Sequence, residues 1–247
     1  MVAERYQVAV SDGVIGELYS IEKLPAGLSL KAYDGVIIGF PVIHTHPSVR
    51  MLRFIEALKP FESPVPACIF CTCGLYSANT LRIFSKACLT KNILPVCTYS
   101  YRCAASDGML LAPFIPVLAT HEKGLESKIL RHCRSFADML ELGDFKAALP
   151  RFKLYSILNY PNKLAGTMVT FPIYLHREPC IRCGRCIANC PSHALSRGDD
   201  GYPLFNSKQC EKCYRCIHYC PQKALSLSKH STPRTVLSEI HRDFDVL

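Results

Sequence analysis

The chain has 247 residues, 49% of them hydrophobic and 20% charged, which is typical of a globular protein of one or two domains. No run of eighteen apolar residues occurs, so the sequence predicts no transmembrane segment. The formal net charge is +9. Lysine and arginine are nevertheless scattered and form no basic run, which argues against a nucleic-acid partner.

The first residues predict a helix followed by a strand. Val2, Tyr6 and Val10 recur at helical spacing, and Gly16–Glu22 is predicted to be the first strand.

Strands and helices then alternate as far as residue 142. Tyr33–Phe40 is a continuous apolar run entered by Asp-Gly, which is typical of a buried parallel strand. Ser48 is the expected N-cap of a helix that ends at Leu58. This alternation predicts an α/β fold with a parallel sheet covered by helices on both faces. The other predicted elements are strands at Pro66–Thr72 and Ile93–Tyr99, and helices at Tyr76–Thr90 and Glu122–Leu142.

Two loops at the ends of these strands resemble the flavin-contacting loops of flavodoxin-like domains. One follows the run Tyr33–Phe40, and the other is the segment Cys71–Thr80. The resemblance implies a flavodoxin-like sheet with FMN at these loops. The residues that it places against the flavin are Pro41, Val42, Thr72, Gly74 and Asn79.

The beginning of the chain departs from the flavodoxin-like pattern. Such domains open with a hydrophobic strand and a loop that holds the FMN phosphate at a helix N-terminus, whereas Met1–Val10 resembles the helix after that loop. Losing a central strand would expose unpaired backbone on two neighbours. We therefore expect an N-terminally incomplete domain, with the loss of the phosphate site in a docking module as the alternative. The chain as given should bind FMN poorly, and FMN is expected only if the N-terminus is completed.

Several cysteines and histidines of the first part of the chain are further candidate sites. Cys71 and Cys73 are the best candidates for a third metal site, but we favour small buried hydrophobes for all seven cysteines outside the C-terminal repeat. His44 and His46 are interpreted as exposed polar residues of a turn rather than flavin-facing groups. The seven cysteines are Cys68, Cys71, Cys73, Cys88, Cys97, Cys103 and Cys133.

The segment 146–170 is alternately basic and apolar. It is expected to pack on its own domains, with binding to a membrane surface as the alternative. Pro150 and Pro161 interrupt its helical stretch, which favours packing.

Eight cysteines near the C-terminus form two runs of the pattern C-x2-C-x2-C-x3-C-P, one thirty residues after the other. Bacterial two-cluster ferredoxins have this spacing, and the fourth cysteine of each run binds the other cluster. A zinc ribbon would lack the third cysteine, and a disulfide framework suits small secreted chains. One [4Fe–4S] cluster is expected at Cys180, Cys183, Cys186 and Cys220, and the other at Cys210, Cys213, Cys216 and Cys190.

The two runs differ at one position, and a tail follows them. Gly184 lets backbone amides approach a sulfide, whereas Tyr214 at the matching position implies either different packing and potential or simple shielding from water. In the tail, Thr232 as N-cap and Pro233 as first residue predict a helix. Its apolar face would consist of Val236, Leu237, Ile240 and Phe244.

Taken in order, these parts resemble the ferrodoxin family, in which a flavodoxin-like domain is fused to a bacterial-type ferredoxin. The resemblance implies low-potential electron transfer with redox proteins, flavoproteins among them. Thiolate ligands require a reducing compartment, so a cytoplasmic location is expected. A flavin-dependent reductase fed by the clusters and a docking module of a larger redox complex remain as alternatives. The expected division is a flavodoxin-like domain (1–145), a connector (146–170), a small α+β ferredoxin domain (171–230) and a tail (231–247).

Overall fold

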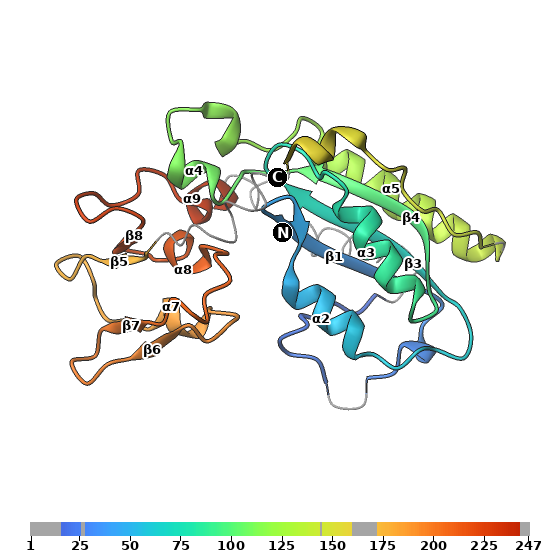
Figure 1. Cartoon of the computed structure of the whole chain (residues 1–247), viewed down its shortest axis with the longest axis horizontal. Helices are drawn as coiled ribbons and strands as arrows, with labels where there is room; N and C mark the ends of the chain where they lie inside the picture. The colour runs from blue at the N-terminus through green and yellow to red at the C-terminus, as the bar shows by residue number, and fades with distance from the viewer. Residues whose placement is uncertain (1–15, 26–27, 144, 160–171, 243–247) are drawn as a thin grey trace. The chain divides into compact units, whose positions relative to one another are not determined.

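The computed structural model describes residues 16–25, 28–143, 145–159 and 172–242. The chain divides into two compact units (Figure 1). Residues 1–102 and 122–164 form the first unit, and residues 103–121 and 165–247 form the second. The predicted helix at Val2, Tyr6 and Val10 lies outside the described residues.

The first unit is built on a four-stranded sheet in the order β2-β1-β3-β4. β1 (Val36–Ile43), β3 (Val65–Cys73) and β4 (Ile93–Arg102) are parallel to one another, as the sequence predicts. β2 (His46–Pro47) pairs antiparallel with the end of β1. β3 is buried along nearly all its length because it has a strand on each side, which explains its continuous apolar sequence.

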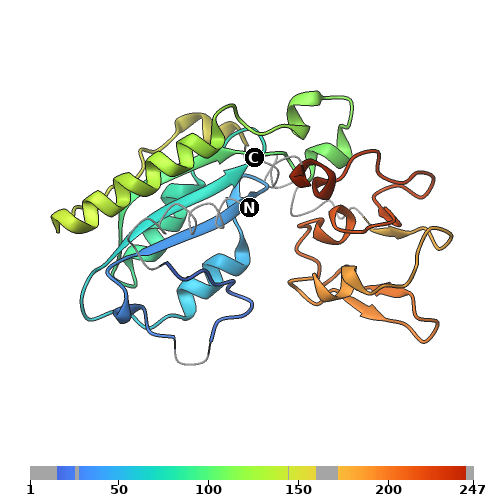
Figure 2. The ribbon, with the colours of Figure 1, turned by 180° about the vertical axis from the view of Figure 1, so that it is seen from behind.

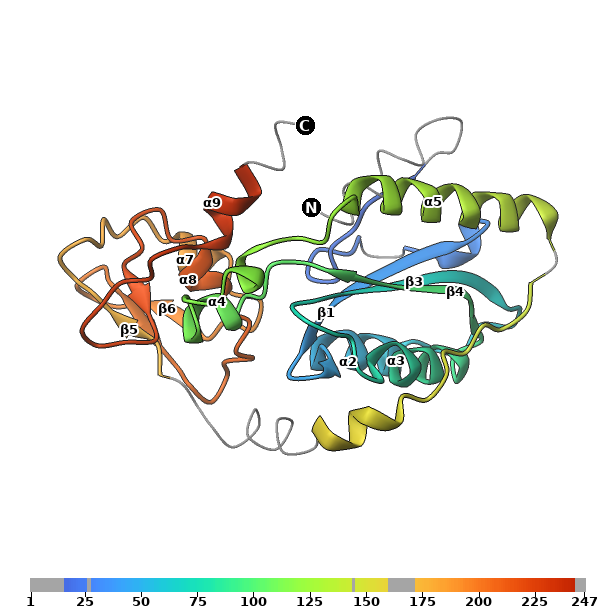
Figure 3. The ribbon, with the colours of Figure 1, turned by 90° about the horizontal axis from the view of Figure 1, so that it is seen from above.

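Helices cover both faces of this sheet (Figures 2 and 3). α2 (Val49–Ala57) and α3 (Thr80–Leu89) lie on one face, and α5 (Leu125–Leu142) lies on the other. Between α2, α3 and the sheet, the rings of Phe40 and Phe84 meet at a centroid distance of 4.2 Å within the main core. The α/β class with a mostly parallel sheet is therefore confirmed. The unit also contains two 3-10 segments, η1 (Leu30–Ala32) and η3 (Leu154–Asn159).

One strand prediction in the first unit was wrong, and the bounds of another were displaced. Gly16–Glu22 is irregular chain followed by a turn, not a strand. The strand predicted at Tyr33–Phe40 is shifted to Val36–Ile43 and is half-buried rather than buried. Its burial is incomplete because no described strand pairs with the outer edge of Val36–Pro41.

Two helices of the first unit begin later than the sequence predicts. α3 starts at Thr80 rather than Tyr76, since the residues before it form a turn in which Ala78 has a φ of 48°. α5 starts at Leu125 rather than Glu122, because Gly124 adopts the left-handed conformation at its N-terminal boundary.

The second unit consists of short elements that repeat. β5 (Tyr174–Leu175) pairs with β8 (Leu225–Ser226), and β6 (Leu195–Arg197) pairs with β7 (Pro203–Phe205), both antiparallel. α7 and α8 have the same length and lie thirty residues apart along the chain. The helical segments of the unit are α4 (Gly108–Leu111), η2 (Pro116–Ala119), α7 (Arg185–Ala188), α8 (Arg215–His218) and α9 (Leu237–Arg242).

The tail helix begins four residues later than predicted, at Leu237 instead of Pro233. The buried Val236 precedes it, and its backbone N–H donates to Glu239 Oε2 at 3.1 Å. The carboxylate at the third helical position thus satisfies a donor at the helix start, as in a capping box. Phe244 lies outside the described residues. Across the described ranges, the longest apolar helical stretch falls short of what crossing a membrane requires.

His132 on α5 links the helix to β4. Its ring stacks on Tyr99 with centroids 3.6 Å apart, and its Nδ1 lies 2.8 Å from the hydroxyl of Tyr101. Tyr101 is fully buried. Burial lowers the pKa of His132, and the nearby cations of Arg131 and Lys128 lower it further. The folded unit therefore favours the neutral imidazole, which can accept the tyrosine O–H.

We predict that the first unit loses stability as the pH falls through the ordinary histidine pKa of about 6.5. The unfolded chain binds a proton there that the folded chain resists, so stability is present above this pH and lost below it. Hydrogen-exchange protection of the β4 amides, corrected for intrinsic rate, should decrease between neutral pH and about pH 5.5. His132→Phe retains the ring and should flatten this decrease; an unchanged pH dependence in the variant would contradict the assignment.

Candidate metal centre

Left-handed backbone conformations recur in the second unit at the same thirty-residue interval as the cysteines. A residue in this conformation reverses the chain locally, and residues other than glycine adopt it only rarely. Two of them in each cysteine run curl the C-x2-C-x2-C segment around a common space. The pairs are Arg182 (φ 54°) with Lys212 (55°), Gly184 (74°) with Tyr214 (54°), and His193 (51°) with Lys223 (50°).

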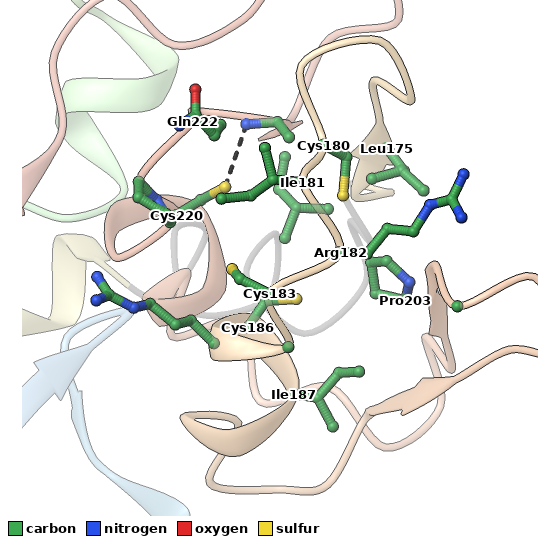
Figure 4. A pocket seen from close by; sticks show the side chains of 16 residues that line it. Leu175, Cys180, Ile181, Arg182, Cys183, Cys186, Ile187, Pro203, Cys220 and Gln222 are labelled. Atoms are coloured by element: carbon green, nitrogen blue, oxygen red, sulfur yellow. Dashed lines mark hydrogen bonds between the residues drawn. The ribbon is translucent and has the colours of Figure 1, made fainter.

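The first predicted ligand set lines one cavity. Cys180, Cys183 and Cys186 come from the first run, and Cys220 comes from the second. Figure 4 shows these side chains around the same space. Cys183 is exposed, so this cavity reaches the surface. The structure thus brings together one cysteine from the far run with three from the near run. The rest of the lining is mixed: it includes the apolar Leu175, Ile181, Ile187 and Leu225 and the polar Arg182, Arg185 and Gln222.

The second predicted set is also drawn together. Burial raises the pKa of the Cys216 thiol, and thiolate charge at Cys213, Cys210 and Cys190 raises it further. Burial likewise raises the pKa of Cys213, with Cys210 and Cys190 adding to the effect. Charge effects of this kind act over short distances, and Cys186 of the first set also contributes at Cys216. Cys216 is 7% exposed, so this set is more buried than the first.

Backbone amides donate to three of the sulfurs. The N–H groups of Ala194 and Ala224 lie 3.2 Å from Cys190 Sγ and Cys220 Sγ respectively. These two contacts are again thirty residues apart. The N–H of Lys212 donates to Cys210 Sγ at 3.4 Å. Hydrogen bonds to the sulfurs are among the features that set the reduction potential of an iron–sulfur cluster.

The arrangement fits an iron–sulfur cluster better than a single ion. Within the described ranges, no three His, Cys, Asp or Glu side chains are close enough to hold one metal ion. A zinc ion needs sulfur ligands about 2.3 Å away on all sides, whereas a cubane distributes its thiolates over several irons. Gly184 adopts a φ of 74°, and a Cβ there would lie 2.7 Å from Nη2 of Arg197.

The predicted FMN contacts come together only in part. Pro41 and Thr72 are register partners at the carboxyl ends of β1 and β3, where a parallel sheet presents ligand-binding loops. Val42 continues β1 and pairs with Pro47 of β2. The chain after β1 thus turns back as a hairpin at His44 and Thr45, whose φ angles are 47° and 60°.

Asn79 is already engaged by another segment of the first unit. Its Oδ1 accepts the N–H of Lys153 at 2.8 Å, and its Nδ2 donates to the carbonyl of Lys153 at 3.2 Å. Lys153 Nζ also donates to Ser77 at 3.1 Å, and Arg82 donates to the carbonyl of Pro150 at 2.6 Å. The described part of the connector therefore packs across the loop that contains Gly74 and Asn79, as expected of a segment that binds its own unit.

The remaining candidate residues are structural. All seven cysteines outside the repeat are buried, and burial raises the pKa of Cys88 and of Cys133 to about 12, which leaves them as unreactive thiols. His44 and His46 belong to the hairpin, as the turn prediction implies, but both are half-buried rather than exposed.

Sequence reasoning missed the association of residues 103–121 with the second unit. β4 ends at Arg102 and α5 begins at Leu125. The connection between them is far longer than the usual connection between a strand and a helix. That length was the available signal, together with Pro113 and Pro116 in a stretch without charges.

The comparisons with known proteins agree with this geometry. Residues 179–225 match the family described as a 4Fe-4S dicluster domain, and this range includes all eight cysteines of the repeat. The chain has no match among curated proteins. The C-terminal part is therefore a ferredoxin-type iron–sulfur domain.

We predict that Asn79→Ala destabilises the contact between the connector and α3. Removing both side-chain groups leaves the N–H and carbonyl of Lys153 unpaired, which costs about 1–3 kcal/mol where they are buried. Limited proteolysis should then cut the region 146–159 faster, with no change in cluster absorbance. Asn79→Asp retains the acceptor and should show a smaller effect. Equal cleavage rates in all three proteins would show that the contact does not hold the connector.

Proposed function

We propose that the chain is a low-potential electron-transfer protein that holds two [4Fe–4S] clusters. Cys180, Cys183, Cys186 and Cys220 hold one cluster, and Cys210, Cys213, Cys216 and Cys190 hold the other. The observation that carries this proposal is the first cavity, in which three cysteines of one run stand with a cysteine of the other. When bound, such clusters accept and donate single electrons.

The chain's own residues give each site its thiolate ligands and stabilise them. The amides of Ala194, Ala224 and Lys212 donate to cysteine sulfur, and hydrogen bonds of this kind tune cluster potentials. Since each site takes its fourth cysteine from the other run, neither half of the domain can complete a site alone. Redox proteins, flavoproteins among them, are the proposed partners.

For the first unit, we propose a flavodoxin-like origin and a docking role within a larger redox complex. Three parallel strands with helices on both faces support the likeness. The engagement of Asn79 by Lys153 favours docking over a flavin-dependent reductase, because a flavin at this loop would compete with the connector.

The cysteine assignment predicts which pairs of variants act together. After anaerobic reconstitution, Cys183→Ala should lose iron from one site and leave the other largely intact. Cys183→Ala with Cys220→Ala should lose no more than that, because both residues serve one site. Cys183→Ala with Cys213→Ala should lose iron from both sites.

Iron content and the electron paramagnetic resonance (EPR) signals of the reduced protein measure these losses. Cys68→Ala is the matched control and should retain full iron, since Cys68 is a buried core residue of β3. If the Cys183 and Cys220 changes add together instead, the fourth ligand is assigned to the wrong site.

FMN should not bind this chain tightly. Titration of micromolar protein with FMN is expected to show no saturable quenching of flavin fluorescence. Stoichiometric FMN binding to the unaltered chain would exclude a purely docking role for the first unit.

A further inference from the structure

The two cysteine runs have matching backbones but different surroundings. Each residue of the second run has a counterpart thirty positions earlier, so burial can be compared pair by pair. Cys213, Cys216 and Ile217 are each less exposed than Cys183, Cys186 and Ile187. The largest contrast is His218, which is fully buried, against the exposed Ala188. Something covers the second run that does not cover the first.

The cover is the segment 103–121, which belongs to the same compact unit as both runs. The segment closes on itself at its base, where the N–H of Ala105 donates to the carbonyl of Leu118 at 2.7 Å. Leu110, on the short helix α4, packs against the core cluster that contains Tyr214, Cys216 and Ile217.

His218 fastens this segment to the second run. Its Nε2 lies 2.8 Å from the carbonyl of Ser106, and its Nδ1 accepts the backbone N–H of Leu237 at 3.2 Å. Because a carbonyl only accepts and an N–H only donates, the ring carries its proton on Nε2. One fully buried side chain thus joins segment 103–121, α8 and the start of α9.

Tyr214 completes the cover on the cysteine side. It stands where the first run has Gly184 and is 3% exposed. It belongs to the same core cluster as Cys216 and Ile217, against which Leu110 of segment 103–121 packs. Tyr214 and segment 103–121 therefore enclose the second run together.

We propose that segment 103–121 is a shield that makes the two iron–sulfur sites unequal. The site of Cys210, Cys213, Cys216 and Cys190 is the shielded one, with the lower reduction potential. The site of Cys180, Cys183, Cys186 and Cys220 is the one that meets partner proteins. This inference rests on the proposed two-cluster function.

The sign of the potential difference follows from solvation. Reduction adds one negative charge, and a site withdrawn from water stabilises added charge less well. Both sites have two cations nearby, so the number of cations does not reverse this order. Arg182 and Arg185 line the first cavity, while Lys212 and Arg215 adjoin Cys210 and Cys213. Exposure of Cys183 also gives the first site the shorter path for an electron to a docked protein.

The test uses the reconstituted full chain under anaerobic conditions. Potentiometric titration followed by EPR should resolve two potentials, and the lower one should be missing from Cys213→Ala and present in Cys183→Ala. Release of iron to a chelator should be severalfold slower from the shielded site. If Cys213→Ala removes the higher potential, or if both sites titrate and release iron alike, the proposal is overturned.

Variants within the shield separate its effect from that of the cysteines. Leu110→Gln, which adds polarity without charge, should raise the lower potential and accelerate iron release from the second site, while the first site is unchanged. Leu110→Ala should do the same to a smaller extent. Because alanine is apolar, this variant disturbs folding less and keeps the test valid if the polar variant misfolds. Phe114→Ala is the matched control, because Phe114 is 79% exposed on the same segment, and it should change neither site. Unchanged values in both Leu110 variants would contradict a shielding role.

Failure of this inference is distinguishable from failure of the proposed function. Two clusters with matching potentials would leave the electron-transfer proposal intact and remove the shield. A chain in which Cys183→Ala and Cys213→Ala fail to affect separate sites would remove both.

Discussion

The second unit depends on one backbone constraint, the left-handed conformation at matched positions of the two cysteine runs. Arg182, Lys212 and Tyr214 adopt it despite their side chains, which is costly for residues other than glycine. In the first run this curl leaves Cys180, Cys183 and Cys186 on one cavity, and Cys220 of the second run lines the same cavity. The two halves therefore share that cavity.

The same constraint explains why the symmetry of the repeat can be broken without loss of the sites. The backbone of each run is set locally, so surrounding segments are free to differ. Residues 103–121 cover the second run through Leu110 and His218, and the first run has no described counterpart to this cover. A long connection in an α/β sheet has in this way become part of an iron–sulfur domain.

Sequence patterns predicted what depends on local chemistry. The cysteine spacing placed Cys220 with the first run, and apolar runs located the three parallel strands. Local sequence patterns did not predict the features that depend on contacts between residues far apart in the sequence. The sequence places Asn79 among the flavin contacts, and no local pattern indicates that its amide pairs with the backbone of Lys153, seventy-four residues away. The strand predicted at Gly16–Glu22 was wrong because apolar content alone does not create a pairing partner. The unusual length of segment 103–121 is visible in the sequence, but its packing against the second cysteine run is not.

The central claim is that eight cysteines hold two clusters in one chain. Chemical determination of iron and acid-labile sulfide on anaerobically reconstituted protein tests it most directly. The account predicts about eight of each per chain, four for each cubane. A stable value of about four in fully reconstituted protein, with normal folding by circular dichroism, would show that one of the two sites does not exist.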